Sequence, residues 1–283
     1  MPNLTDITNI KRILSEHGFN FSKALGQNFL INPSVCPKMA ECSVAGDNYG
    51  VIEIGPGIGV LTAELAKRAK KVVSVELDKR LLPVLSKTLS GFDNVKIINA
   101  DALKVDFHKL IRDEFDGMNV AICANLPYYI TSPIIMSLLE SRLPLTSITV
   151  MVQKEAAKRI SAPVGTRESG AISVAVSYYC EPEIMFNVSR GSFMPAPNVD
   201  STVIRLNIRQ KLPIDVSDEK KFFSLVRAAF SQRRKTVVNS VSSCLGIEKA
   251  VVIKALEQAM LDKNVRAEEL LMVDFKKLYD MIF

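Results

Sequence analysis

A glycine-rich turn follows one of several short apolar runs in the sequence. Residues 51–54, Val-Ile-Glu-Ile, lead directly into Gly55-Pro-Gly57-Ile-Gly59. Glycines at such a point let the backbone turn sharply and approach a ligand at the carboxyl edge of a sheet. The spacing is G-x-G-x-G, and the last glycine of a dinucleotide fingerprint would fall on Val60. This spacing disfavours a pyrophosphate on the next helix, and a tight turn without a ligand is the alternative interpretation.

Acidic residues stand at the ends of the next two apolar runs. Glu76 ends the run 72–75, 21 residues after Gly55, and a carboxylate there can accept hydrogen bonds from both hydroxyls of a ribose. Asp101 follows the run 95–98 and is placed to accept a hydrogen bond from an adenine amino group. Either acid alone could be a surface cap. Together with the glycine turn they mark the ends of three successive strands, and they predict a nucleoside site.

The fourth apolar run, residues 120–123, ends in Asn125-Leu-Pro-Tyr128. A polar residue, a proline and an aromatic residue at a strand end fit methylation of an amino nitrogen on a planar base such as adenine. The exocyclic amine of adenine is a poor nucleophile because its lone pair is delocalised into the ring. If the Asn125 side-chain oxygen and a neighbouring backbone carbonyl accept its hydrogens, the nitrogen shifts towards sp3, while Tyr128 stacks on the extruded base. Pro127 stiffens the loop, and no general base is needed in a chain with two histidines. A strand-terminal turn with a core aromatic residue is the alternative.

Helical patterns separate these apolar runs. One helix face is formed by Leu61, Leu65 and Ala66, and another by Leu81, Leu82, Leu85 and Leu89. A further β-rich run covers residues 148–152. Strands that alternate with helices of this length imply βαβ units and a parallel sheet with both faces covered. We expect residues 184–188 and 202–208 to add edge strands to the same sheet.

Helical patterns replace the strands after a linker at residues 210–218. They cover residues 219–230, 235–244, 248–260 and 267–282, and one apolar stripe is formed by Leu270, Leu271, Phe275, Leu278 and Ile282. Ser217 or Asp218 is placed to begin the first of these helices, and Gly246 to end a later one. The sequence therefore predicts an α/β domain over residues 1–209, with an N-terminal helical extension, and a small all-helical domain over residues 210–283.

The net charge is concentrated in one part of the chain. The 283 residues hold 36 Lys and Arg against 30 Asp and Glu, which gives a formal charge of +6. Residues 205–240 hold nine basic and three acidic residues, so the rest of the chain is balanced. A local excess of this kind suggests a docking surface for a polyanion, and a solvated helix face is the alternative.

The composition excludes several other classes of protein. An apolar fraction of 48% excludes wholesale disorder, and no run approaches the 18 or so apolar residues of a membrane-spanning helix. The N-terminus lacks the pattern of a secretory signal. Five cysteines without a C-x-x-C pair indicate free thiols in a reducing cytosol, and with two histidines they give no metal site. No nucleophile elbow and no phosphate-binding P-loop motif is present.

A glycine loop, a ribose acid and a base acid without the phosphate-binding spacing resemble the core of S-adenosylmethionine-dependent methyltransferases. With the upstream segment Lys23-Ala-Leu-Gly-Gln-Asn-Phe-Leu30, nearly the whole chain closely resembles the bacterial small-subunit (16S) rRNA adenine dimethyltransferases. The other motifs that carry this resemblance are Glu53-Ile-Gly-Pro-Gly57, Val75-Glu-Leu-Asp78, Asn99-Ala-Asp101-Ala102, Asn125-Leu-Pro-Tyr128, Gln153-Lys-Glu155, Phe193-Met-Pro-Ala-Pro-Asn-Val-Asp-Ser201 and Ala229-Phe-Ser-Gln-Arg-Arg-Lys235.

The resemblance implies a Rossmann-like methyltransferase domain and a helical C-terminal domain that docks on rRNA. The activity it implies is dimethylation of the 6-amino groups of two adjacent adenosines in a hairpin loop near the 3′ end of 16S rRNA. S-adenosylmethionine is the implied cofactor, and 16S rRNA within the immature 30S subunit is the implied partner. We expect a cytoplasmic monomer that acts in small-subunit biogenesis and has no membrane partner.

The resemblance also implies roles for individual residues. Those implied to contact the cofactor are Asn28, Leu30, Gly55, Gly57, Glu76, Asp101 and Asn125, and those implied in catalysis are Asn125, Leu126 and Tyr128. Phe193 is a candidate second face for the flipped adenine, with a core position as the alternative. Arg233, Arg234 and Lys235 are candidate phosphate contacts, with a solvated helix end as the alternative. Without the resemblance, Gly26–Leu30 is a turn before the helix that Pro33 starts, with Phe29 and Leu30 in the core.

One departure and two rival functions stand beside this interpretation. The family usually has Tyr-Gly where this chain has Ser169-Gly170, so no aromatic packing role is expected at position 169. The related large-subunit rRNA adenine methyltransferases that confer macrolide resistance more often carry Ile where Leu126 stands. A non-catalytic assembly factor or transcription-factor-like paralogue is the other rival, and the intact glycine loop, Glu76 and Asn125 argue against it.

Overall fold

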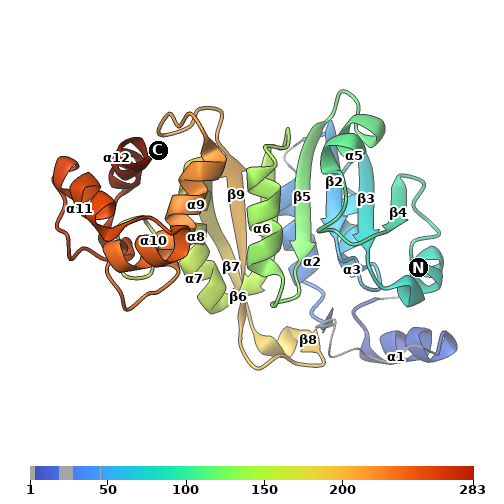
Figure 1. Ribbon diagram of the computed structural model, residues 1–283. Helices are drawn as coiled ribbons and strands as arrows, with labels where there is room; N and C mark the ends of the chain where they lie inside the picture. Colours follow the sequence, from blue (N-terminus) through green and yellow to red (C-terminus); the bar gives the residue numbers. More distant parts are fainter. Residues whose placement is uncertain (1–3, 19–27, 45) are drawn as a thin grey trace. The chain divides into compact units, whose positions relative to one another are not determined.

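The computed structural model describes residues 4–18, 28–44 and 46–283 (Figure 1). Its contacts divide the chain into two compact units. The first runs to Ala157 and includes Glu183–Ile208, and the second consists of Lys158–Pro182 and Arg209–Phe283. The sequence places a single boundary after residue 209, which is next to one of these divisions. Residues 158–182 belong to the second unit because their aromatic side chains pack there, as described below.

A seven-stranded sheet organises the first unit. The strands lie in the order β4 (Val95–Asn99), β3 (Lys71–Glu76), β2 (Tyr49–Ile54), β5 (Asn119–Asn125), β6 (Ser147–Gln153), β9 (Ser201–Ile208) and β7 (Cys180–Val188). The neighbouring strands from β4 to β6 are parallel, as predicted, and β9 is antiparallel to β6. The apolar run 202–208 was expected at an edge but lies inside the sheet, between β6 and β7.

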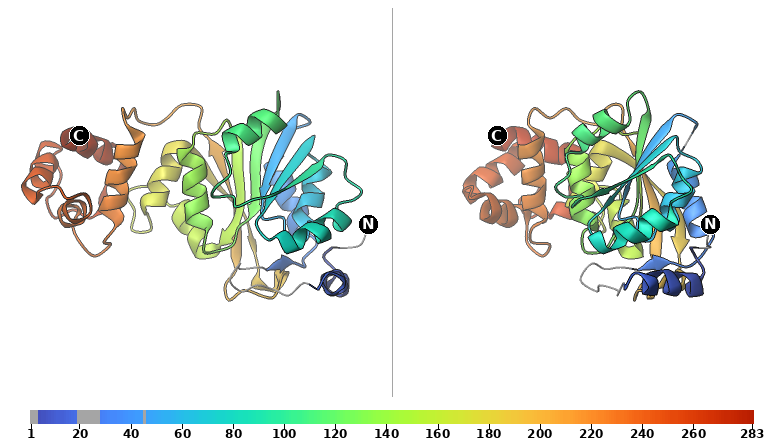
Figure 2. Two further views of the ribbon diagram at one scale, coloured as in Figure 1. Left: turned by 45° about the vertical axis from the view of Figure 1, so that its right-hand side comes forward. Right: turned by 90° about the vertical axis from the view of Figure 1, so that its right-hand side faces the viewer.

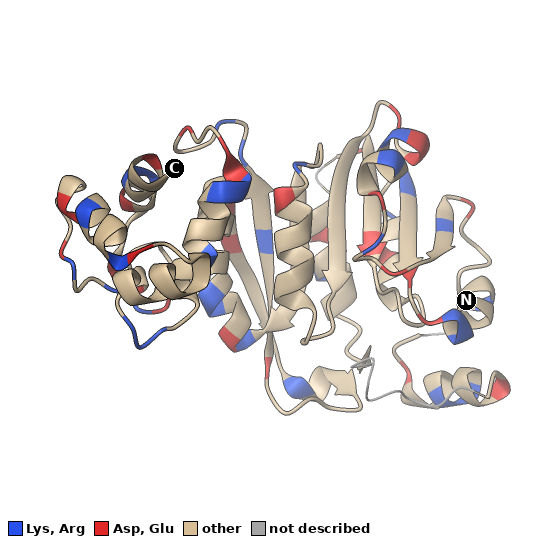
Figure 3. Ribbon diagram, in the orientation of Figure 1, with Lys and Arg blue, Asp and Glu red and all other residues tan. Residues whose placement is uncertain are grey.

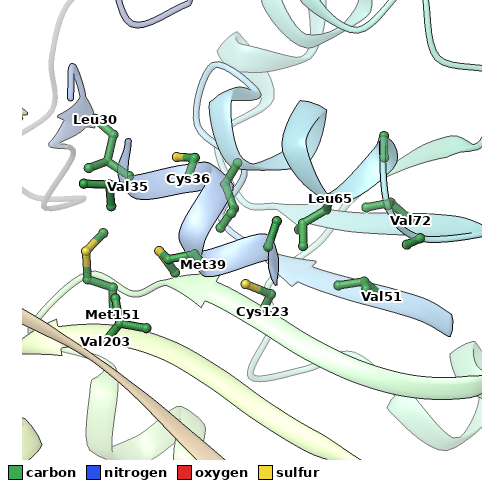
Figure 4. Packing of buried hydrophobic residues seen from close by; sticks show 14 of the residues in the cluster. Leu30, Val35, Cys36, Met39, Val51, Leu65, Val72, Cys123, Met151 and Val203 are labelled. Carbon is green, nitrogen blue, oxygen red and sulfur yellow. The ribbon is translucent and has the colours of Figure 1, made fainter. Parts of the chain in front are cut away.

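Helices cover both faces of this sheet, as Figures 1 and 2 show. The helices α2 (Val35–Ser43) and α3 (Val60–Ala66) lie on one face, and α5 (Phe107–Glu114) and α6 (Thr131–Glu140) on the other. Figure 4 shows the core beneath α2, where Cys36 and Met39 pack against Cys123, Met151 and Val203 of the strands. Because helices bury both faces of the sheet, the strands have continuous apolar sequences.

Two short strands and four further helical segments complete the part of the first unit that carries the site. The strand β1 (Phe29–Leu30) pairs antiparallel with β8 (Phe193–Met194), which follows the 3₁₀ turn η3 (Arg190–Ser192). The segments α1 (Ile7–Glu16), η2 (Lys79–Leu81) and α4 (Leu82–Thr88) share a second buried cluster with Phe29 and Ile58. The pairing of β1 with β8 places residues 28–30 beside the carboxyl edge of the main sheet.

The second unit is helical, as predicted. It contains α8 (Ala171–Tyr179), α9 (Glu219–Phe230), α10 (Val237–Leu245), α11 (Lys249–Gln258), η4 (Ala267–Glu269) and α12 (Met272–Ile282), while α7 (Lys154–Ile160) begins in the first unit. Asp218 begins α9, because its side chain accepts a hydrogen bond from the Lys221 N–H. Gly246 ends α10 with a left-handed φ of 68°.

Two features of the second unit differ from the sequence prediction. Tyr178 and Tyr179 of α8 pack on Phe223, with ring centroids 5.3 Å away in each case, and their hydroxyls donate to the Glu219 carboxylate. These contacts explain why residues 158–182 belong to the second unit. The predicted stripe at residues 267–282 is wrong at Leu271, which is 51% exposed. The chain is extended there, so η4 and α12 are separate segments.

The described residues contain no helix with the length and apolar character needed to span a membrane. The five cysteines all lie within the described part of the chain and are unpaired, as expected.

Candidate active site

The glycine turn connects β2 to α3 in a left-handed backbone conformation. Gly55 has φ +71°, and its N–H donates to the Val75 carbonyl at 3.0 Å, which joins the ends of β2 and β3. A Cβ atom on Gly55 would meet nothing within 4 Å, so the space in front of it is open. At Gly57, φ +60°, a Cβ atom would come within 3.2 Å of the Phe29 ring. The turn therefore leaves room for a ligand at Gly55 and is closely packed at Gly57.

Glu76 lies at the end of β3, where its carboxylate accepts backbone hydrogen bonds. Its Oε1 accepts from the Asp78 N–H at 2.7 Å. Burial raises the pKa of Glu76, while backbone N–H groups of Asp78, Gly57 and Leu77 act in the opposite direction. The carboxylate is thus fixed beside the glycine turn with acceptor capacity left for a ligand.

Asp101 lies after β4 and is more open than Glu76. Its Oδ1 accepts from the Leu103 N–H at 3.0 Å, and its Oδ2 lies 3.9 Å from the Lys104 ammonium. Lys104 is itself largely exposed, so this ion pair is weak. The backbone bond thus fixes the carboxylate through one of its two oxygens.

Glu53 is a cleft residue that our reading of the sequence did not single out. Its Oε2 accepts hydrogen bonds from the Thr62 and Ser74 hydroxyls, each at 2.6 Å, while its buried Oε1 has no partner among the described residues. Burial raises the pKa of Glu53 to about 7, against the effect of the two hydroxyls. An acid inside an otherwise apolar strand was the available signal, because a buried carboxyl group without a packing role is costly.

The Asn-Leu-Pro-Tyr segment lies on the other side of the sheet's switch point. The strand β5 neighbours β2 and ends at Asn125. The N–H of the next residue, Leu126, donates to the Met151 carbonyl of β6 at 3.3 Å. Leu126 is buried, whereas Asn125 and Tyr128 are half-buried. The Tyr128 hydroxyl shares a hydrogen bond of 3.0 Å with the Ser201 hydroxyl, which fixes the ring. Open α/β sheets bind ligands at such a switch point.

One cleft joins the glycine turn to this segment and encloses about 1160 Å³, part of it open to solvent. Each residue predicted for the cofactor or for catalysis lines it: Asn28, Leu30, Gly55, Gly57, Glu76, Asp101, Asn125, Leu126 and Tyr128. Phe193 lines it as well, although this residue is buried and pairs with Leu30 between β8 and β1. The sequence prediction thus named residues that come together, while their individual roles stay predictions.

The remaining predicted residues lie elsewhere. Arg233, Arg234 and Lys235 are exposed in the turn between α9 and α10 of the second unit, and Arg233 donates to the Arg167 carbonyl at 3.2 Å. Ser169 is buried, and its hydroxyl donates to the Thr166 carbonyl at 2.7 Å, so a small polar contact stands where the family usually has Tyr. Gly26 and Gln27 lie outside the described residues.

The distribution of charge differs between the two units. The second unit holds 17 basic and 12 acidic residues, against 19 and 18 in the first. Figure 3 shows Lys and Arg on both the helices and the connecting turns of the second unit. Most of the net positive charge therefore belongs to the helical unit.

The sheet and the cleft define a Rossmann-like protein with a ligand-sized cleft at the carboxyl edge of its parallel strands. The family model of ribosomal RNA adenine dimethylase matches residues 18–280, and the chain belongs to this family of methyltransferases. Ribosomal RNA small subunit methyltransferase A of Geobacillus thermodenitrificans (strain NG80-2) is 50% identical over 272 residues, which are 95% of this chain and 93% of that protein.

Two solved structures share the fold over most of the chain. A dimethyladenosine transferase from Plasmodium falciparum has a TM-score of 0.71 at 28% identity, over 88% of this chain and 95% of that one. The 23S rRNA methyltransferase ErmE has a TM-score of 0.66 at 27% identity, over 90% of this chain and 99% of that one. One of these two proteins is named for dimethyladenosine transfer and the other for methylation of 23S rRNA.

Proposed function

We propose that this chain dimethylates the 6-amino groups of two adjacent adenosines in a hairpin loop near the 3′ end of 16S rRNA. The observation that carries the proposal is the joining of Gly55, Glu76, Asp101 and Asn125 in one cleft. The 50% identical relative, a small-subunit methyltransferase by name, supports the choice of rRNA. The enzyme acts in small-subunit biogenesis, on 16S rRNA within the immature 30S subunit, and works as a monomer in the cytoplasm.

The cofactor half of the cleft suits S-adenosylmethionine. When bound, this group supplies an electrophilic methyl on a sulfonium. Glu76 would hold the ribose hydroxyls and Asp101 the adenine amine, while Asn28, Leu30, Gly57 and Asn125 would contact other parts of the molecule. The open space in front of Gly55 and the Glu53 Oε1, which has no partner among the described residues, fit a ligand with donor groups at this place.

The catalytic half of the cleft would prepare the adenosine amine for attack. The side-chain amide of Asn125 makes no hydrogen bond to other described residues, so its oxygen is available as an acceptor. The side chain of Leu126 is buried, and this residue contributes its backbone carbonyl as the second acceptor. Tyr128, fixed through Ser201, would stack on one face of the flipped base, with Phe193, which also lines the cleft, as the candidate for the other face.

The helical unit would hold the rRNA outside the cleft. We assign rRNA docking to residues 210–283, with Arg233, Arg234 and Lys235 as phosphate contacts that position the substrate. Their exposure in a turn and the positive balance of this unit support the assignment.

The rival substrate is an adenosine of large-subunit rRNA, as in the name of the structural relative ErmE. That protein shares the fold but only 27% of the sequence, against 50% for the small-subunit relative, and position 126 is Leu here. The identity favours the small subunit.

The proposal is tested by mass spectrometry of rRNA from a bacterial strain that lacks its own copy of the gene. We expect two missing dimethyladenosines near the 3′ end of 16S rRNA, restored by this chain and not by its Asn125→Ala variant. Dimethylation of large-subunit rRNA instead, with an unchanged 16S rRNA, would support the rival.

A further inference from the structure

Tyr129 follows the catalytic segment in the turn that leads into α6, and the function proposed above gives it no role. Its side chain is 57% exposed, yet it lines the cleft. Among the described residues it makes no hydrogen bond or ring contact, whereas Tyr128 is held by Ser201. Packing within the unit therefore does not account for a large aromatic ring at this position.

An exposed cation is tied to the same part of the site. The backbone N–H of Lys154 donates to the Asp200 carbonyl at 3.0 Å, and the next residue, Ser201, holds the Tyr128 hydroxyl. The Lys154 side chain is exposed and forms no salt bridge with the described residues. The Gln153-Lys-Glu155 motif thus joins the backbone of an exposed lysine to the segment that fixes Tyr128.

We propose that Tyr129 and Lys154 form a subsite for the nucleotide next to the target adenosine. The Tyr129 ring stacks on the neighbouring base, and the Lys154 ammonium contacts a flanking phosphate. This inference rests on the proposed function, in which the substrate is a single-stranded loop of rRNA. When one base of such a loop is flipped into the cleft, the neighbouring base is left unstacked at the mouth of the cleft. Aromatic rings stack on such bases irrespective of their identity. With two adjacent target adenosines, the subsite would hold one while the other reacts.

The first arm of the experiment measures methylation kinetics on small subunits that lack these methyl groups. We expect Tyr129→Ala to raise the KM for subunits about 10-fold and Tyr129→Phe, which keeps the ring, to restore it. The affinity for S-adenosylmethionine, measured by calorimetry, should stay at the wild-type value. Ile184→Ala is the matched control, since Ile184 is 54% exposed on β7 and does not line the cleft.

The second arm measures the salt dependence of subunit binding. Lys154→Gln should lower the slope of log affinity against log salt by about one. Lys70→Gln should not, because Lys70 is exposed before β3, at the opposite edge of the sheet.

Two results would overturn the subsite. One is a KM for Tyr129→Ala equal to that of wild type and Ile184→Ala. The other is a loss of S-adenosylmethionine affinity with unchanged subunit binding, which would assign Tyr129 to the cofactor. Failure of the proposed function gives a different result, because the wild-type protein itself would then leave small subunits unmethylated.

Discussion

The two ends of the cleft are built in different ways. At the glycine turn, Glu53 and Glu76 are buried and take hydrogen bonds from neighbouring hydroxyls and backbone N–H groups. At the other end, Asn125 is the last residue of β5 and Tyr128 lies in the turn after it; both are half-buried, and Tyr129 is exposed. A small cofactor needs a site that is formed before it binds, whereas a folded RNA can supply much of its own positioning. We infer that, in the proposed function, the end at the glycine turn determines affinity for the cofactor and the end at Asn125 determines chemistry and RNA specificity.

The largest effect is expected at Asn125. Asn125→Ala removes the side-chain acceptor and should lower the single-turnover rate of methyl transfer by about 100- to 1000-fold. Asn125→Asp keeps an acceptor oxygen and should lose less. Both variants should bind small subunits as wild type does in a filter-binding assay. Normal turnover by the alanine variant would contradict the division between the two ends.

The Glu53 carboxyl should make the stability of the protein depend on pH. Its pKa is raised from 4.5 to about 7 in the folded protein, so its ionisation destabilises the folded state. The stabilising effect of the proton is present below pH 4.5 and is lost as the pH rises through about 7, with a total change of up to about 3 kcal/mol. Glu53→Gln cannot ionise and should lack this component.

Urea unfolding of both proteins at pH 5 and pH 8 measures this difference. Because other groups titrate equally in the two proteins, the change in wild-type minus variant stability isolates Glu53. An unchanged difference between the two pH values would mean that the carboxyl is not buried as described.

Charge reversal in the helical unit should weaken RNA binding without affecting the cleft. Reversing Arg233, Arg234 and Lys235 to Glu should reduce affinity for small subunits by about 10- to 100-fold and lower the salt slope by about 2. The matched control reverses three exposed lysines of the same unit: Lys249, Lys254 and Lys263. Equal losses in both triple variants would show that net charge matters and that the turn between α9 and α10 has no special role.

The smallest expected effect tests the open space at the glycine turn. Gly55→Ala should reduce S-adenosylmethionine affinity by about 10-fold in calorimetry, because its Cβ enters the cleft. Gly117 has φ +68° and equally open surroundings, but it lies before β5 and away from the cleft. Gly117→Ala should therefore have a similar strain of about 1 kcal/mol and normal cofactor affinity. A similar loss of affinity in both variants would point to strain alone.

Much of the fold could be predicted because apolar runs and turn residues carry local signals. The runs 51–54 and 120–123 lie within β2 and β5, and the residues that follow them meet at one edge because the strands are parallel and adjacent. The start of α9 at Asp218 and the end of α10 at Gly246 could also be predicted, because helix capping depends on a few neighbouring residues.

Contacts between residues far apart in the sequence could not be predicted in this way. The pairing of Leu30 with Phe193 joins two-residue strands far apart in the chain, and such short strands have no periodicity. The interior position of β9 depends on the order of the strands in the sheet. The exposure of Leu271 depends on where the chain leaves η4 and begins α12. The orphan oxygen of Glu53 depends on which hydroxyls fold against it, so sequence gave only an acid in an apolar strand.

Methyl incorporation into purified small and large subunits, side by side, tests the central claim most directly. The subunits come from a strain without these modifications, and each is incubated with the wild-type protein and labelled S-adenosylmethionine. We expect two methyl groups on each of two adjacent adenosines near the 3′ end of 16S rRNA and none on the large subunit. Incorporation into the large subunit alone, or into neither, would contradict the account.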